Sequence, residues 1–189
     1  MDTHFASPER AAPELLSAQI QKVHDDVLVS GLLQTISGIL GIVNEHRQVV
    51  ALNDTFLEVL GVRDPEGCLG LRPGEALQCV HAHEMEGGCG TANSVVTCGA
   101  AIAMVASFAN WMNEERVCAL TVQGKFGDKD LSFLVKAHPI TVEGERYLLL
   151  LLQDITMQER RAALERTFFH DVNNVLQTLL SASELLLLD

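Results

Sequence analysis

The apolar residues of this 189-residue chain change their spacing twice, and this change limits the possible folds more than any other feature. Near the start, four of them follow at intervals of four, three and four, on one face of a helix: Leu16, Ile20, Val23 and Val27. Short β-branched runs begin at residue 36, and a helical pattern returns after residue 156. This order excludes an all-helical bundle and predicts a mixed fold.

The spacing assigns each apolar run to a helix or a strand. Five strands are predicted, at residues 36–44, 48–53, 115–123, 130–140 and 145–153. Four helices are predicted, at residues 13–35, 54–61, 94–110 and 157–188. Residues 1–12 are expected to be a frayed terminus. Strands that alternate in groups with separate helices indicate an α+β domain with an antiparallel five-stranded sheet.

Charge and composition exclude several classes of function. The formal net charge of −12 argues against a nucleic-acid-binding surface, which requires clustered Lys and Arg. The apolar run at residues 148–152 is far shorter than the roughly 20 residues that span a bilayer. The polar start of the chain does not resemble a secretion signal, so we expect a cytoplasmic protein with reduced cysteines.

The stretch "GILGIVNEHRQVVALNDTFLEVLG" at residues 38–61 is similar to the first hairpin and helix of PAS sensor domains. The tripeptide Asp154-Ile155-Thr156, which follows the last predicted strand, is similar to the end of such domains. The resemblance covers residues 34–156 and implies a PAS-like sensor domain. That domain is expected to be flanked by an N-terminal helix and a C-terminal coiled-coil helix.

The last predicted helix contains His170 within the sequence "FFHDVNN". An apolar seam runs along this helix at close to heptad spacing: Phe169, Val172, Leu176, Leu179 and Leu186. His170 lies one step off the seam and shares its helix face with polar residues: Arg166, Asn174, Gln177 and Ser181. A histidine in this position is most often an ordinary solvated residue. The adjacent Asp171 could instead fix the imidazole tautomer and make the ring a nucleophile.

"FFHDVNNVLQTLLSASELL" resembles the phosphoacceptor helix of sensor histidine kinases. The resemblance implies that His170 receives the γ-phosphoryl group of ATP and that Asp171 is its acid/base partner. It also implies that Asn174 orients water when the kinase dephosphorylates its response regulator. The kinase requires an ATP-binding domain with Mg-ATP, and the chain has no glycine-rich nucleotide lid. We therefore expect a fragment that ends within the phosphoacceptor helix and is inactive alone.

The expected organisation has three parts. Residues 1–33 form a helical dimerisation segment, residues 34–156 form the sensor domain, and residues 157–189 begin the phosphoacceptor helix. Both terminal helices carry narrow apolar seams that a monomer would leave in water, so a parallel homodimer is predicted. The alternative is a non-catalytic PAS module for redox sensing or for metal or ligand binding, which dimerises through its helices.

A cysteine and histidine cluster at residues 79–98 is a candidate for metal chemistry. Cys79, His81, Cys89 and Cys98 offer thiolate and imidazole ligands, which suit zinc or an iron–sulfur cluster. The spacing contains no C-x2-C pair, so a redox thiol role and simple core packing stay open as alternatives. Cys118 and Trp111 are expected to pack in the core.

Overall fold

The computed structural model describes residues 5–60, 65–92, 97–123 and 127–186. The chain divides into two compact units, which meet in the sequence between Asp154 and Ile155. The first unit contains a sheet with helices, and the second contains helix α6 (Thr156–Leu186). The two units are described separately below.

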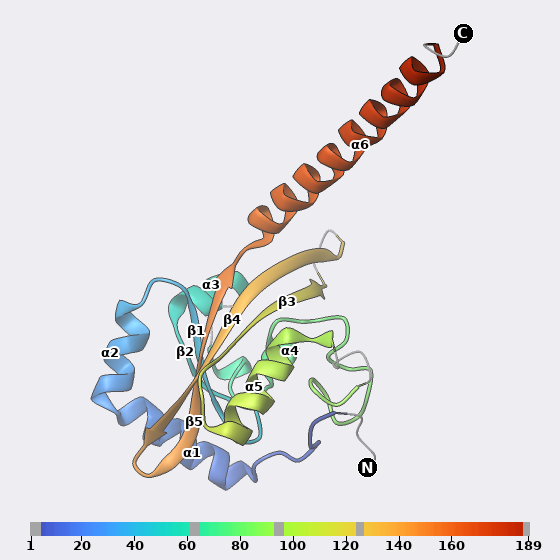
Figure 1. The fold of residues 1–189 in the computed structure, drawn as a ribbon. Helices are drawn as coiled ribbons and strands as arrows, with labels where there is room; N and C mark the ends of the chain where they lie inside the picture. Colours follow the sequence, from blue (N-terminus) through green and yellow to red (C-terminus); the bar gives the residue numbers. More distant parts are fainter. Residues whose placement is uncertain (1–4, 61–64, 93–96, 124–126, 187–189) are drawn as a thin grey trace. The chain divides into compact units, whose positions relative to one another are not determined.

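An antiparallel five-stranded sheet forms the centre of the first unit (Figure 1). Its strands are β1 (Ile39–Asn44), β2 (Val49–Leu52), β3 (Glu114–Val122), β4 (Lys129–Val142) and β5 (Glu145–Asp154). They lie in the order β2-β1-β5-β4-β3, so the first hairpin pairs with the last strand of the chain. Each predicted strand is present, and the predicted α+β fold with an antiparallel five-stranded sheet is confirmed.

Strand β4 extends beyond its neighbour β3. Its pairing with β3 extends to Ala137, which lies opposite Glu114. Its pairing with β5 continues to Val142, which lies opposite Glu145, and Pro139 lies opposite Leu148. The last five residues of β4 therefore pair with β5 alone.

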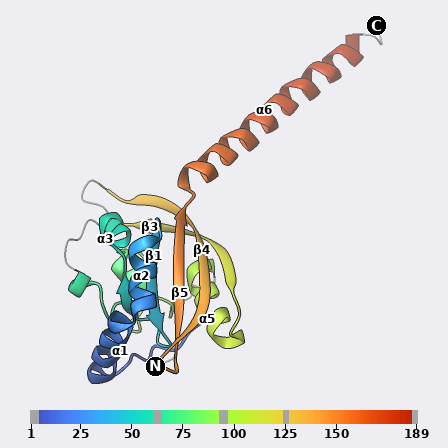
Figure 2. The ribbon, with the colours of Figure 1, turned by 90° about the vertical axis from the view of Figure 1, so that its left-hand side faces the viewer.

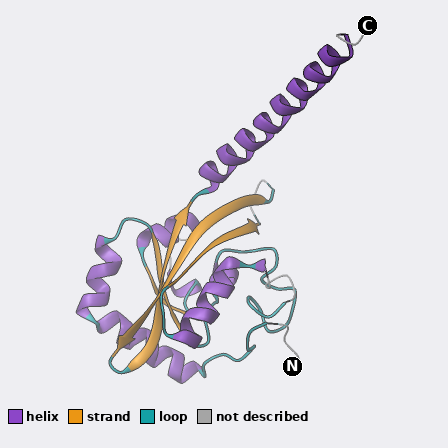
Figure 3. Cartoon of the chain, viewed as in Figure 1, coloured by secondary structure: helices purple, strands orange, loops and turns teal. Residues whose placement is uncertain are grey.

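Helices cover both faces of the sheet (Figures 1 and 3). On one face lie α1 (Pro13–Asp25) and α2 (Val27–Thr35), which Figure 2 places in front of the sheet. On the other face lie α3 (Asp54–Leu60), the 3-10 turn η1 (Pro65–Gly67), α4 (Pro73–Ala76) and α5 (Gly99–Asn110). The larger core lies under this second group and includes Phe56, Met104 and Phe133.

The predicted helix at residues 13–35 is wrong in one respect, because it is two helices. Asp26 has an extended backbone, with φ −72° and ψ 114°, and so ends α1. Its carboxylate accepts hydrogen bonds from the backbone N–H groups of Leu28 and Val29, at 2.9 and 3.0 Å. Asp26 is thus the N-cap of α2, and the break turns Val27 out to solvent.

The apolar stripe of α1 is not left in water by a single chain. Leu16, Ile20 and Val23 pack against the outer face of the sheet, where Val50 and Tyr147 are buried. This docking removes the argument for a homodimer that rested on the N-terminal seam. The homodimer itself stays a prediction, which now depends on α6.

Two expectations about α5 and its end also need correction. The helix begins at Gly99 rather than at residue 94, and residues 94–96 lie outside the described residues. Trp111 does not plug the core, since 36 % of its surface is exposed. It adopts the left-handed conformation that ends α5, and the guanidinium of Arg146 lies 4.2 Å from its ring centre.

Candidate functional site

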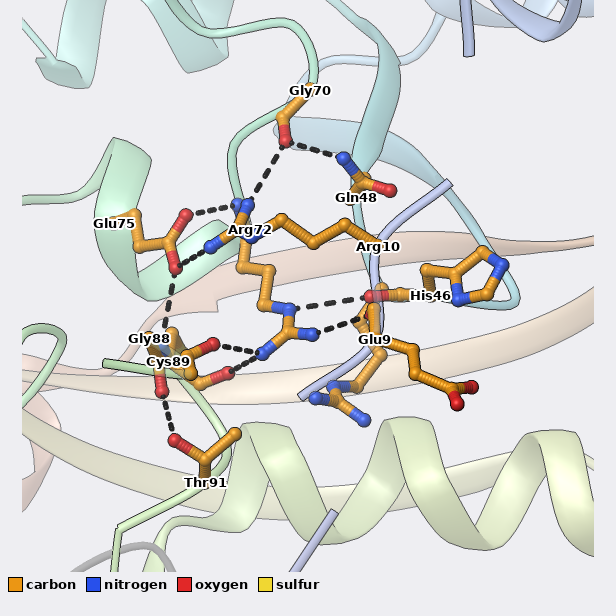
Figure 4. A network of polar contacts seen from close by, with 12 residues as sticks. Glu9, Arg10, His46, Gln48, Gly70, Arg72, Glu75, Gly88, Cys89 and Thr91 are labelled. Carbon is orange, nitrogen blue, oxygen red and sulfur yellow. Dashed lines mark hydrogen bonds and ion pairs between the residues drawn. The ribbon is translucent and has the colours of Figure 1, made fainter. Parts of the chain in front are cut away.

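A buried arginine positions the cysteine-bearing loop of the first unit (Figure 4). The side chain of Arg72 is fully buried, and its guanidinium donates five hydrogen bonds of 2.7 to 3.3 Å. All five acceptors are backbone carbonyl oxygens: those of Ser7, Glu9, His46, Gly87 and Cys89. Burial lowers the pKa of Arg72 to about 10, which leaves it charged at neutral pH. One side chain therefore joins the N-terminal segment to the cysteine loop.

Glu75 completes this network from the first turn of α4 (Figure 4). Its carboxylate accepts hydrogen bonds from the backbone N–H groups of Arg72 and Cys89, at 2.9 and 3.1 Å, and from the side chain of Arg10. Burial acts to raise the pKa of Glu75, but the hydrogen bonds outweigh it and hold this pKa below its usual value. The predicted frayed terminus is therefore wrong for residues 5–12, which are tied to the domain.

An apolar cavity of about 50 Å³ lies within the core, between α4, α5 and the sheet. Four cysteines line it: Cys79, Cys89, Cys98 and Cys118. Gly74 is necessary beside this wall, because a Cβ atom there would lie 2.5 Å from Cys89 Sγ. The remaining lining side chains are apolar, among them Leu77 and Met104. The fold thus gathers four thiols that are up to 39 residues apart in sequence.

A second, more open pocket of about 320 Å³ lies on the outer side of the cysteines. It shares Cys79, Cys89 and Cys98 with the inner cavity and adds His81. His81 is largely exposed, and its Nδ1 atom contacts the carboxylate of Glu84. The predicted ligands therefore lie in one region, with the imidazole at the solvent side.

The described residues do not form a ready metal site. Within them, no three His, Cys, Asp or Glu side chains are grouped so that they could hold a metal ion. The prediction of a metal or iron–sulfur site at Cys79, His81, Cys89 and Cys98 stays a prediction. Cys118 lies in the core, as expected, but it also belongs to the cavity wall, which the sequence did not indicate.

The four thiols differ in their acidity. A hydrogen bond from the Cys118 thiol lowers the pKa of Cys98 to about 6, against burial and with help from the N–H groups of Ala101 and Ala100 at the start of α5. The same hydrogen bond raises the pKa of Cys118. Burial raises the pKa of Cys79, and it raises that of Cys89 to about 12. Cys98 is therefore the thiol of this group that ionises most easily.

In the second unit, α6 presents His170 to solvent, with 73 % of its side chain exposed. Its Nδ1 atom lies 3.4 Å from Asp171 Oδ1 and 3.1 Å from Asn174 Nδ2. Both contacts that described residues make with the ring are at Nδ1, so Nε2 faces solvent. The helix thus brings together the three residues predicted as catalytic.

Another histidine shows how much of this geometry is common to exposed helices. His24 Nδ1 lies 3.3 Å from Asp25 Oδ1, and 81 % of the His24 side chain is exposed. A His-Asp pair in sequence therefore forms this contact without any special surroundings. What distinguishes His170 is the additional contact with Asn174 and its place in a helix of 31 residues.

Similar proteins were found among solved structures only. No family model matches the chain, and no curated protein matches it either. Among solved structures, the PAS domain of an HTR-like protein from Haloarcula marismortui is 16 % identical, with a TM-score of 0.43. The match covers 75 % of this chain and 99 % of that chain.

Two further solved structures are similar at the same level. The PAS domain of nitrogen regulation protein NR(II) from Vibrio parahaemolyticus is 13 % identical, with a TM-score of 0.48. This match covers 69 % of this chain and 100 % of that chain. The PAS domain from Bordetella pertussis BvgS is 15 % identical, covers 78 % and 96 %, and has a TM-score of 0.45. In the described residues, no helix is both long and apolar enough to cross a membrane.

Proposed function

We propose that this chain is the sensory and dimerisation part of a bacterial two-component sensor histidine kinase. In this proposal residues 34–156 detect the signal, and residues 157–189 contain the dimerisation helix. The observation that carries it is the exposed His170 ring, whose Nδ1 contacts Asp171 and Asn174 while Nε2 faces solvent. We expect the protein to act in the cytoplasm, where its five cysteines stay reduced.

Nε2 of His170 is the proposed nucleophile. A neutral imidazole has one protonated nitrogen. In the proposed reactive tautomer Nδ1–H donates a hydrogen bond to Asp171, which leaves the lone pair on Nε2. This nitrogen attacks the γ-phosphorus of ATP, and the bond to the bridging oxygen breaks as ADP leaves. The Asp171 carboxylate stabilises the positive charge that develops on the ring.

Asn174 is proposed to act when the kinase works as a phosphatase on its response regulator. Its Nδ2 group is a donor, so its contact with Nδ1 requires a lone pair on that atom and the proton on Nε2. This tautomer cannot attack phosphorus through Nε2. The contact therefore favours the tautomer of His170 that does not attack ATP. This fits the proposed role of Asn174, which is to orient water during dephosphorylation of a response regulator.

Dimerisation is proposed to occur through α6. Its apolar seam is exposed in the single chain, with Phe169 at 62 %, Val172 at 37 % and Leu176 at 51 %. An exposed row of large apolar side chains on a long helix is typical of a helix–helix interface. His170 lies one position from the seam, so a dimer would leave it accessible to a catalytic domain.

The test uses an ATP-binding catalytic domain, supplied in trans or present in a longer chain, with labelled ATP and Mg²⁺. Acid-labile phosphate should appear on the wild-type chain and be absent from His170→Gln. His24→Gln is the matched control, because it removes the other exposed His-Asp pair, and it should be labelled like the wild type. Equal labelling of all three proteins would make His170 an ordinary surface residue.

A second candidate function is a redox or ligand-binding module, and the cavity lined by cysteines favours its redox form. The inner cavity of about 50 Å³ is far below the roughly 300–1,000 Å³ of sites for organic ligands, whereas the outer pocket of about 320 Å³ lies at the lower end of that range. An absorption spectrum and metal analysis of freshly purified protein separate the possibilities. Visible bands or stoichiometric zinc would indicate a cofactor, whereas a colourless, metal-free protein would favour thiol chemistry.

A further inference from the structure

Cys98 and Cys118 form a sulfur pair that the proposed kinase function does not use. Cys98 is the N-cap residue of α5, Cys118 lies in β3, and their Sγ atoms are 3.8 Å apart. A disulfide requires an S–S distance of about 2.05 Å, so the two sulfurs must approach by less than about 2 Å.

Backbone packing holds the two cysteines next to each other. Gly99 follows Cys98, and a Cβ atom at this position would lie 2.0 Å from the carbonyl oxygen of Val117. Only glycine allows the first turn of α5 to lie this close to β3. Cys98 directly precedes Gly99, and Cys118 directly follows Val117. The close approach of Gly99 to Val117 therefore places the two cysteine side chains together.

The two cysteines differ in access. Cys98 lines both the outer pocket of about 320 Å³ and the inner cavity of about 50 Å³. Cys118 lines only the inner cavity and is 1 % exposed. A small molecule that enters the outer pocket therefore meets Cys98 first, while Cys118 is held behind it in a dry environment.

We infer that Cys98 and Cys118 form a reaction site for small hydroperoxides, with Cys98 as the attacking sulfur and Cys118 as the resolving sulfur. The Cys98 thiol attacks the distal oxygen of ROOH, the O–O bond breaks, and ROH leaves with a Cys98 sulfenic acid formed. The Cys118 thiol then displaces water from this sulfenic acid, and the S–S bond forms. A dithiol reductant restores both thiols. This chemistry does not depend on His170.

The apolar cavity suits the second step of this reaction. Both sulfurs border its empty volume, so they can approach each other without displacing a neighbouring side chain. The disulfide would join the start of α5 to the middle of β3. Oxidation would therefore fix the helix that covers the inner face of the sheet.

The test begins with the reduced full chain, treated with one equivalent of hydrogen peroxide without air. Intact mass should fall by two hydrogen atoms per chain and return after dithiothreitol. Cleavage after Arg116 separates Cys118 from the other four cysteines, so linked peptides show that Cys118 takes part in the disulfide, and the variants identify its partner. Cys79→Ser and Cys89→Ser should still form it, and Cys98→Ser should not.

Trapping of the intermediate gives a second, independent measurement. Cys118→Ala cannot resolve the sulfenic acid, so Cys98 should be labelled by dimedone in this variant and much less in the wild type. Cys68→Ser, which changes a cysteine outside the cavity wall, should behave as the wild type. A disulfide from Cys118 to Cys79 or Cys89, or oxidation of Cys98→Ser at the wild-type rate, would overturn the inference. Bound metal that protects the thiols of the wild type would also overturn it.

Discussion

The Nδ1 atom of His170 lies 3.1 Å from the amide Nδ2 atom of Asn174, one helical turn further along α6. Asp171 Oδ1 lies 3.4 Å from the same ring nitrogen. An amide donor requires a lone pair on Nδ1, whereas a carboxylate requires a proton there. The two neighbours of His170 therefore favour opposite tautomers, and substitutions at each should have opposite consequences.

Asn174→Ala should preserve phosphorylation of His170 and slow dephosphorylation of the partner response regulator. The substitution removes the donor that favours the resting tautomer and the amide proposed to orient water. We expect a loss on the order of tenfold to a hundredfold in the phosphatase rate, as for a misplaced reactant. Following labelled phosphate on both proteins separates the two rates. A variant with impaired labelling of His170 and normal phosphatase activity would contradict these roles.

Asp171→Asn should slow phosphorylation, by about 10² to 10⁴ in rate, because the charge that assists the imidazole is lost. The helix should be unchanged, since 70 % of the Asp171 side chain is exposed. Asp25→Asn changes the matching residue beside His24 and serves as the control. Initial rates of label incorporation are the measurement, and equal rates for all three proteins would remove Asp171 from the mechanism.

Leu176→Glu should convert a dimer into a monomer. Leu176 belongs to the exposed seam of α6, and a buried glutamate would be unfavourable in a helix–helix interface. Gln177→Glu adds the same charge one residue away, off the seam, and should remain a dimer. Sedimentation equilibrium at micromolar concentration distinguishes these states. A wild-type protein that sediments only at 20.6 kDa would exclude the proposed interface.

Arg72→Met should destabilise the first unit by about 3–5 kcal/mol, since five backbone carbonyl groups lose the buried donor that they share. Arg116→Met is the control, because Arg116 is exposed and pairs with Glu114 at the surface. Urea unfolding followed by Trp111 fluorescence gives both free energies of unfolding. If the two variants were equally stable, Arg72 would not hold the N-terminal segment in place.

The stability that Glu75 contributes should disappear in acid. Its pKa in the folded protein lies below the reference value of 4.5, so its stabilisation is complete above that pH and is lost as the pH falls through the folded pKa. At pH 7, Glu75→Gln should cost about 1–3 kcal/mol. The free energies of unfolding of variant and wild type should converge below pH 4.5, and a constant difference down to pH 3 would refute this assignment.

The strands could be predicted from sequence because their cause is local. Each of the five runs carries β-branched or alternating apolar residues between polar turns, and this pattern is sufficient to locate a strand within a few residues. The break at Asp26 was missed for a physical reason. An aspartate on the polar face of a helix and an aspartate that caps the next helix look the same in sequence.

The contacts around the cysteines could not be predicted, because they depend on groups that the sequence does not mark. Arg72 binds backbone carbonyls, and every residue has one, so nothing identified Ser7 or Glu9 as its partners. Cys118 was predicted correctly as a core residue. Its contact with Cys98 arises only when α5 folds back on β3, and sequence spacing contains no information on that approach.

The unequal length of β4 and β3 has a consequence for solubility. Beyond Ala137, β4 pairs with β5 alone, so its other side resembles the open edge of a sheet. Open edges can recruit strands from other molecules and start aggregation. Pro139 lies within this stretch and has no backbone N–H to offer an incoming strand. Pro139 thus protects the part of β4 that β3 does not cover. Pro139→Ala should therefore make the protein more prone to aggregate.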